Sequence, residues 1–113
     1  MKPTTRYDIC IAQSGVFRLV IDVVGGPDSI AGYIGEMQIR KTKSSEEVLG
    51  EMDPGWFTVD SVNSQVILEI PDTETELYDW TGWAVYDMYL VGPDRWRILE
   101  GKVGLDKTVT KEV

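Results

Sequence analysis

The sequence has no histidine and a single cysteine, Cys10. Without histidine, the chain cannot build a Ser-His-Asp triad, ligate zinc through imidazole or use imidazole as an acid or base. With one cysteine it can form neither an internal disulfide nor a cysteine metal cluster. Cys10 lies in a strand-like alternation, where we expect a small buried or half-buried side chain and not a nucleophile. This thiol usage suits a bacterial cytoplasm, or a virus assembled there, better than a secreted disulfide scaffold.

Basic residues are also scarce, since eleven Lys and Arg stand against nineteen Asp and Glu and give a formal charge of −8. Such a surface repels phosphate backbones. The densest basic patch, Arg40, Lys41 and Lys43, is followed at once by Glu46 and Glu47. We therefore expect no nucleic-acid partner. Apolar runs fall far short of the ~20 residues that span a bilayer, and no signal peptide is recognisable, so we expect no membrane partner either.

With 113 residues, 42 % of them apolar, the chain has room for one domain with one hydrophobic core. We predict a single β-sandwich domain over residues 1–113, with residues 1–5 and 106–113 as extended or flexible ends. No internal repeat, low-complexity tract or linker divides it. The polar stretch 41–53 predicts a long loop or an excursion at a sheet edge.

Alternation of apolar and polar residues with period two dominates the rest of the chain. It predicts strands over residues 7–11, 16–23, 33–40, 65–70, 83–91 and 95–105, and a further short strand within 56–62. Turn signals recur about every ten to twelve residues, and the sharpest is Gly92–Pro93–Asp94. This rhythm predicts an all-β fold, an Ig-like antiparallel β-sandwich of about seven strands. The predicted core residues are Phe17, Leu19, Ile21, Leu68, Tyr86 and Leu99.

The segment from Pro71 to Leu77 departs from the strand pattern. Its proline ends a strand, and Thr73 and Glu76 then stand at capping-box spacing. We predict one or two helical turns that cross from one sheet to the other. Its carboxylates suit the start of a helix better than a cation site, because the spacing lacks the glycine and the bidentate final glutamate of a calcium loop.

Any catalysis would rest on carboxylates, hydroxyls, lysine or tyrosine. Asp87 and Glu100 are the one strand-borne carboxylate pair that the predicted hairpin brings together. Lys102 is placed to neutralise this pair, which favours a structural role, and no phosphate-binding glycine loop is present. We therefore expect a protein that is not an enzyme, with no catalytic residues, no cofactor and no metal ion.

Both faces of the predicted hairpin, residues 83–91 and 95–105, are apolar. With a four-residue loop, one face carries Tyr86, Met88 and Leu90 with Leu99, Gly101 and Val103. The other face carries Trp83, Val85, Tyr89 and Val91 beside Trp96 and Ile98. A sandwich core covers only one face, so the second needs a cover from the Tyr78–Trp80 segment or from another subunit. A three-residue loop or a bulge would exchange the faces.

From this pattern we predict that the second face is a protein–protein interface formed by Trp83, Val85, Tyr89, Trp96 and Ile98. The alternative is a carbohydrate-binding β-sandwich module, because exposed Trp and Tyr rings also stack on sugars.

The order of motifs along the chain points to a known family. The motifs are Gly15–x–Phe17–x–Leu19–x–Ile21, Ile30–Ala31–Gly32–Tyr33, Met37–Gln38–Ile39–Arg40, Val66–x–Leu68–x–Ile70–Pro71, Tyr86–Asp87–Met88, Leu99–x–Gly101–x–Val103 and Val109–Thr110. In this order, over about residues 7–110, the chain resembles the small Ig-like β-sandwich domains of tailed-bacteriophage virions. It is similar to the N-terminal domain of siphophage baseplate upper proteins and to related tail, neck and fibre-attachment proteins.

The resemblance implies a non-enzymatic structural protein of the virion, assembled in the host bacterial cytoplasm. It implies an adaptor or assembly domain in the tail, baseplate, neck or fibre attachment, present in multiple copies as a homo- or hetero-oligomer with other virion structural proteins. The host-binding part of baseplate upper proteins follows this domain and is not implied here. The family pattern also suggests that Gly32 and Tyr33 close a tight corner and that Gly101 leaves room for the Tyr86 ring. Arg40 either pairs with a carboxylate at an assembly contact or stays solvated.

Overall fold

Strands make up most of residues 5–110, the part of the chain that this computed structural model describes. The predicted extended or flexible ends, residues 1–5 and 106–113, fall outside the described part at 1–4 and 111–113. The strands are β1 (Thr5–Arg6), β2 (Ile9–Ala12), β3 (Phe17–Asp22), β4 (Ile34–Arg40), β5 (Val48–Glu51), β6 (Phe57–Asp60), β7 (Gln65–Ile70), β8 (Trp83–Val91) and β9 (Arg95–Asp106). A 3₁₀ turn, η1 (Pro54–Trp56), precedes β6, and a one-turn helix, α1 (Asp72–Thr75), follows β7.

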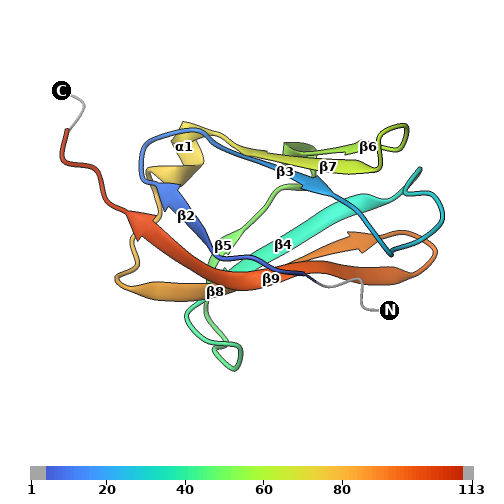
Figure 1. Cartoon of the computed structure of the whole chain (residues 1–113). Coiled ribbons are helices and arrows are strands. Elements are labelled where there is room, and N and C mark those ends of the chain that lie inside the picture. The colour runs from blue at the N-terminus through green and yellow to red at the C-terminus, as the bar shows by residue number, and fades with distance from the viewer. Residues whose placement is uncertain (1–4, 111–113) are drawn as a thin grey trace.

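Two sheets face each other across the core, as Figure 1 shows. The larger sheet has the order β1-β9-β8-β4-β5, with β2 also paired to β9, and the smaller sheet has the order β3-β7-β6. The predicted all-β sandwich is confirmed. The antiparallel pattern has one departure, because β1 and β2 run parallel to β9.

The chain bends between β1 and β2, and Gly101 of β9 makes room for this bend. The Tyr7 amide donates to the Glu100 carbonyl at 2.7 Å, and a Cβ on Gly101 would clash with the Tyr7 carbonyl oxygen. Gly101 does face Tyr86 across the hairpin, as predicted. The space that it leaves is filled by the Tyr7 backbone, not by the Tyr86 ring. The Tyr86 hydroxyl donates to the same Tyr7 carbonyl and fixes the bend.

The hydrophobic core lies between the sheets and draws mainly on β4, β7, β8 and β9. Three of the predicted core residues, Leu68, Tyr86 and Leu99, are buried. The other three, Phe17, Leu19 and Ile21, point toward the core but are only half-buried. Their depth was overestimated because β3 is an edge strand, which within residues 5–110 has a neighbouring strand on one side only.

The crossing from the smaller to the larger sheet runs through α1, as predicted (Figure 1). Pro71 is the N-cap residue, so the capping box expected from Thr73 and Glu76 does not form. The buried Thr75 hydroxyl instead donates to the Gly15 carbonyl at 2.7 Å and ties α1 to the segment before β3.

Two further elements follow the sequence pattern. The polar stretch 41–53 contains β5, the edge strand of the larger sheet, which confirms an excursion at a sheet edge. The short strand expected within residues 56–62 is β6.

Candidate interaction surface

The β8–β9 hairpin carries all five residues predicted to form an interface. At the base of the hairpin its register agrees with the prediction, since Tyr86 faces Gly101 and Met88 faces Leu99 on the core side. Trp83 and Val85 consequently lie on the outer face of the larger sheet, opposite Gly104 and Lys102.

Toward the tip, the hairpin departs from the prediction. Its loop has three residues, 92–94, and the register shifts so that Ile98 is an extra residue on β9. Beyond this bulge, Tyr89 faces Arg97 and Leu90 faces Trp96. Ile98 is 4 % exposed, and Trp96 packs against the core. The expectation that Trp96 and Ile98 share a face with Trp83, Val85 and Tyr89 is therefore wrong, because a bulge exchanges the two faces of a strand.

The inward turn of Trp96 is stabilised by hydrogen bonds at the hairpin tip. Its indole N–H donates to the Asp94 carboxylate at 2.7 Å, and the Tyr33 hydroxyl donates to the same carboxylate. The hydrogen bond from Tyr33 and that from Trp96 lower the pKa of Asp94. Gly32, with a φ of +82°, turns the chain just before Tyr33, so the tight corner is as predicted, and the Tyr33 hydroxyl tethers it to Asp94.

Trp83 lies on the outer face and is 54 % exposed. Ring atom Cζ3 lies 3.3 Å from the position that a Cβ of Gly104 would occupy, so the indole lies across the glycine backbone. The Lys41 ammonium donates to the carbonyls of Thr81 and Trp83 and holds the start of β8 in place. Trp83 thus presents an apolar ring to solvent from a fixed strand.

The segment Tyr78–Trp80 does not cover this ring. Both side chains are buried in the core, their ring centroids 5.4 Å apart, and the Trp80 indole N–H donates to the Val103 carbonyl at 3.2 Å. This segment therefore does not provide the cover from within the chain that was one of the two alternatives for the second face.

A shallow polar depression of about 270 Å³ adjoins Val85 on the same outer face. Its lining residues include Gln38 and Arg40 of β4, Lys43, Asp87 and Tyr89 of β8, and Arg95, Arg97 and Glu100 of β9. Asp87 and Glu100 face each other, as predicted. The cations at Glu100 are Lys43 at 3.5 Å and Arg97 at 3.9 Å. Neutralisation thus comes from these two residues, and not from Lys102 as expected, because Lys102 faces Val85.

Cations outnumber carboxylates in the lining of this depression. Partial burial raises the pKa of Asp87, and the nearby guanidinium groups of Arg97 and Arg95 oppose this rise. Arg40 donates to the Gln38 side chain at 2.9 Å and to the Ser45 carbonyl at 2.7 Å, so it anchors the 41–47 loop. The depression offers charged donors and acceptors to a polar partner.

Tyr89, the third predicted residue on the outer face, already has an aromatic partner. The Arg95 guanidinium carbon lies 3.8 Å above the centre of its ring, and Arg95 also pairs with Glu36 at 2.6 Å. One face of the Tyr89 ring is therefore covered by a cation.

The gathering of Arg40 and Lys43 with Arg95 and Arg97 at one depression was missed, because these two groups lie far apart in the sequence. The sequence shows that Arg95 and Arg97 alternate with Trp96, so either the two arginines or the tryptophan faces solvent. The position of the bulge decides which.

No family model matches the sequence, and no curated protein matches it. Within residues 5–110, no group of three or more Cys, Asp or Glu side chains is placed to hold a metal ion. No helix in this part of the chain has the length and apolar character needed to cross a membrane.

Proposed function

We propose that this chain is a non-enzymatic structural protein of a tailed-bacteriophage virion, an adaptor that joins other tail, baseplate, neck or fibre-attachment proteins. The observation that supports an adaptor role best is the exposed Trp83 ring on the outer face of the larger sheet. A large apolar side chain that is held on a rigid strand contributes most to the free energy of binding when a partner protein buries it. Trp is prominent among the residues that dominate interface energies.

The surroundings of Trp83 add to this argument. Protein interfaces are enriched in aromatic residues and arginine, and the polar depression beside Val85 supplies Arg40, Arg95 and Arg97. The chain as a whole carries a formal charge of −8, which disfavours loose self-association. A partner that covers Trp83 with an apolar pocket and faces the arginines with carboxylates fits this surface.

The second candidate function is carbohydrate binding, which the flat Trp83 ring over Gly104 favours. Sugar platforms stack a pyranose on a free aromatic face. Of the other aromatic side chains predicted for such a platform, Tyr89 is covered by Arg95 and Trp96 is turned toward the core. Of these three rings, Trp83 alone is free on the outer face, which makes a protein partner the stronger proposal.

The deciding experiment compares Trp83→Ser with the parent chain, co-expressed with the structural proteins encoded beside it. We expect Trp83→Ser to weaken co-purification and incorporation into particles about 30-fold, the equivalent of about 2 kcal/mol, at an unchanged melting temperature. Undiminished incorporation would overturn the proposal. Retention on a polysaccharide column that is lost in Trp83→Ser would favour the carbohydrate module instead.

A further inference from the structure

The free edge of the smaller sheet is a second surface, separate from the outer face that carries Trp83. β3 pairs with β7 on one side, and no strand among the described residues pairs with its other side. The Val23 amide donates to the Ser64 carbonyl on the β7 side at 2.8 Å. Because backbone groups alternate along a strand, the N–H and C=O groups of Arg18, Val20 and Asp22 point to the free edge. Such an edge is a template for another strand.

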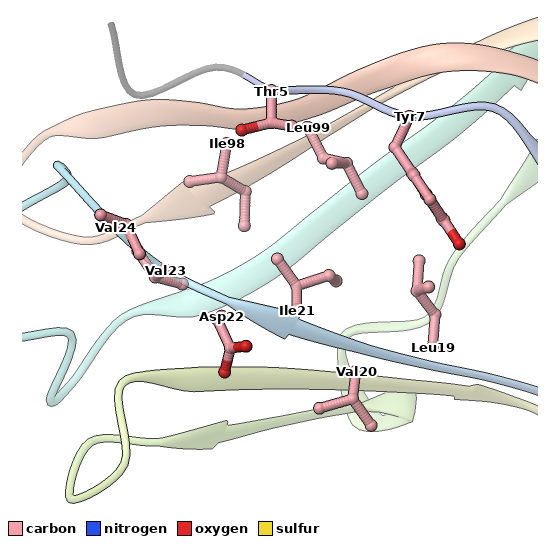
Figure 2. Close-up of a pocket in the computed structure, with 10 residues that line it drawn as sticks. All are labelled: Thr5, Tyr7, Leu19, Val20, Ile21, Asp22, Val23, Val24, Ile98 and Leu99. Carbon is pink, nitrogen blue, oxygen red and sulfur yellow. The ribbon is translucent and has the colours of Figure 1, made fainter. Parts of the chain in front are cut away.

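The side chains of the same three residues lie on the outer face of β3. Val20 is 44 % exposed. Figure 2 shows Leu19 and Ile21 pointing toward Ile98 and Leu99, and Val20 and Asp22 pointing to the opposite side of the strand. One set of residues thus presents both the unpaired backbone and an exposed pattern of basic, apolar and acidic side chains.

This pattern is complementary to itself when the strand is reversed. We infer that β3 pairs antiparallel with β3 of a second copy of this chain, in the register that places Val20 opposite Val20. In this register Arg18 faces Asp22 of the second copy, and Asp22 faces Arg18. Each of the three residues then exchanges both backbone hydrogen bonds with the residue opposite. The exposed Val16 and Val24, which flank β3, face each other when the same register continues.

The charges of Arg18 and Asp22 favour a second copy of this chain at the free edge, and they favour the register with Val20 opposite Val20. Within one chain, Arg18 lies 3.5 Å from Glu69, and the Gln65 amide donates to Asp22 at 2.9 Å. The dimer extends this row, because Arg18 then lies between Glu69 and the Asp22 of the second copy. A register shift of two residues separates Arg18 from Asp22. A shift of four residues places like charges opposite each other, which is unfavourable in a sheet.

The inner side of β3 favours the same occupant. Leu19, Ile21 and Val23 line an open groove of about 380 Å³ together with Tyr7, Ile98 and Leu99. In the proposed register, Leu19 lies opposite Ile21 of the second copy, so the inner side chains of each strand extend the apolar cover of the other. The half-buried side chains of β3 thereby gain the cover that an edge strand lacks.

The first test is the association state of the full chain by sedimentation velocity. We expect a dimer in which Val20→Lys raises the dissociation constant at least about 30-fold, because it places two ammonium groups at the two-fold axis. The matched control is Val48→Lys, a valine on the edge strand of the larger sheet, which should leave the dimer intact. Circular dichroism checks that both variants keep the parental fold.

A parent chain that stays monomeric at millimolar concentration would overturn the inference, even if it binds an extended peptide of another protein at this edge. A dimer that survives Val20→Lys would do the same, since it must use another surface.

The second test reads the register. Arg18→Asp and Asp22→Arg should each weaken the dimer, and the double variant should restore it, because both charge pairs are then reversed together. Within one chain, Glu69 has the same acidic neighbour at position 18 in Arg18→Asp and in the double variant. The fold is therefore perturbed equally at this position in both, and recovery of the dimer in the double variant reports the contact between the two copies. If the double variant associates no better than the single ones, the register is wrong.

Cysteine cross-linking provides an independent check in a Cys10→Ser background. Val20→Cys should form a disulfide-linked dimer under mild oxidation, because residues opposite each other in a hydrogen-bonded pair have Cα atoms about 5.5 Å apart. Val16→Cys should not cross-link, because its two copies are eight positions apart, about 27 Å along the strand. The reverse outcome, cross-linking through position 16 alone, would overturn the inference.

Discussion

The base and the tip of the β8–β9 hairpin follow the same alternation of side chains but present opposite chemistry to solvent. At the base, Trp83 faces outward and Tyr86 faces the core. At the tip, Trp96 faces the core, and Arg95 and Arg97 take the outer face. The difference comes from one inserted residue, Ile98. It teaches that a bulge determines which residues of a strand are available to a partner as much as composition does.

Deletion of Ile98 has the largest expected effect on this comparison. Without the extra residue, β9 alternates regularly, so Trp96 stays on the core side and Arg97 on the outer side, but the buried Ile98 side chain is lost. We expect the free energy of unfolding in urea to fall by about 4 kcal/mol, within the range for removal of a buried isoleucine side chain. Ile98→Val, which keeps the bulge, should cost only about 1 kcal/mol. Equal midpoints for the two variants would contradict the contribution of the bulged residue to the core.

Trp96→Ser tests the tip alone. The variant loses a half-buried ring and its hydrogen bond to Asp94, so we expect a loss of about 2–3 kcal/mol, below the range for fully buried tryptophans. Denaturant unfolding with circular dichroism measures it. A loss below about 0.5 kcal/mol would place Trp96 on the surface after all.

The tip should also respond to acid through Asp94. Hydrogen bonds in the folded state lower its pKa, so Asp94 contributes stability above its unfolded pKa and loses that contribution as the pH falls through its lower folded pKa. We expect Asp94→Asn to be less stable than the parent at pH 7 and to show a flatter decline of melting temperature on acidification. Asp28→Asn, an exposed loop residue, serves as the control for removing one charge. Parallel pH profiles for Asp94→Asn and the parent would exclude this role.

Trp83→Ser should have the smallest effect on stability, within about 0.5 kcal/mol, because the ring is mostly exposed. The measurement is the same urea titration used for Trp96→Ser. A loss as large as that of Trp96→Ser would show that the ring is part of the fold, and the proposed interface at the base would fall with it.

Local patterns predicted the strands and much of the core. Period-two alternation identified which side chains of β3, β7 and β8 point toward the core, and it identified Leu68, Tyr86 and Leu99 as buried. The half-buried state of Phe17 was not predictable in this way. It depends on which strand lies at an edge, and strand order is a property of the whole chain.

The candidate site was predictable only in part, for the same reason. Trp83 and Val85 lie where the alternation of β8 places them. The position of Trp96 depends on the exact length of the hairpin loop and on a bulge, and the turn signal Gly92–Pro93–Asp94 specifies neither. The polar depression joins Arg40 of β4 with Arg97 of β9, and this meeting requires β8 to lie between those strands.

The parallel pairing of β2 with β9 gives the molecule a mechanical property. Ile9 begins the ladder beside Val103, and Ala12 ends it beside Asp106. The chain therefore enters the ladder at one end and leaves it at the other (Figure 1). Tension between the two ends of the domain pulls β2 and β9 past each other, so their hydrogen bonds bear the load together in shear. In a hairpin pulled at its open end, by contrast, the hydrogen bonds break one after another. Because forced unfolding is governed by the unfolding rate, this ladder acts as a clamp that protects the sandwich from stretching.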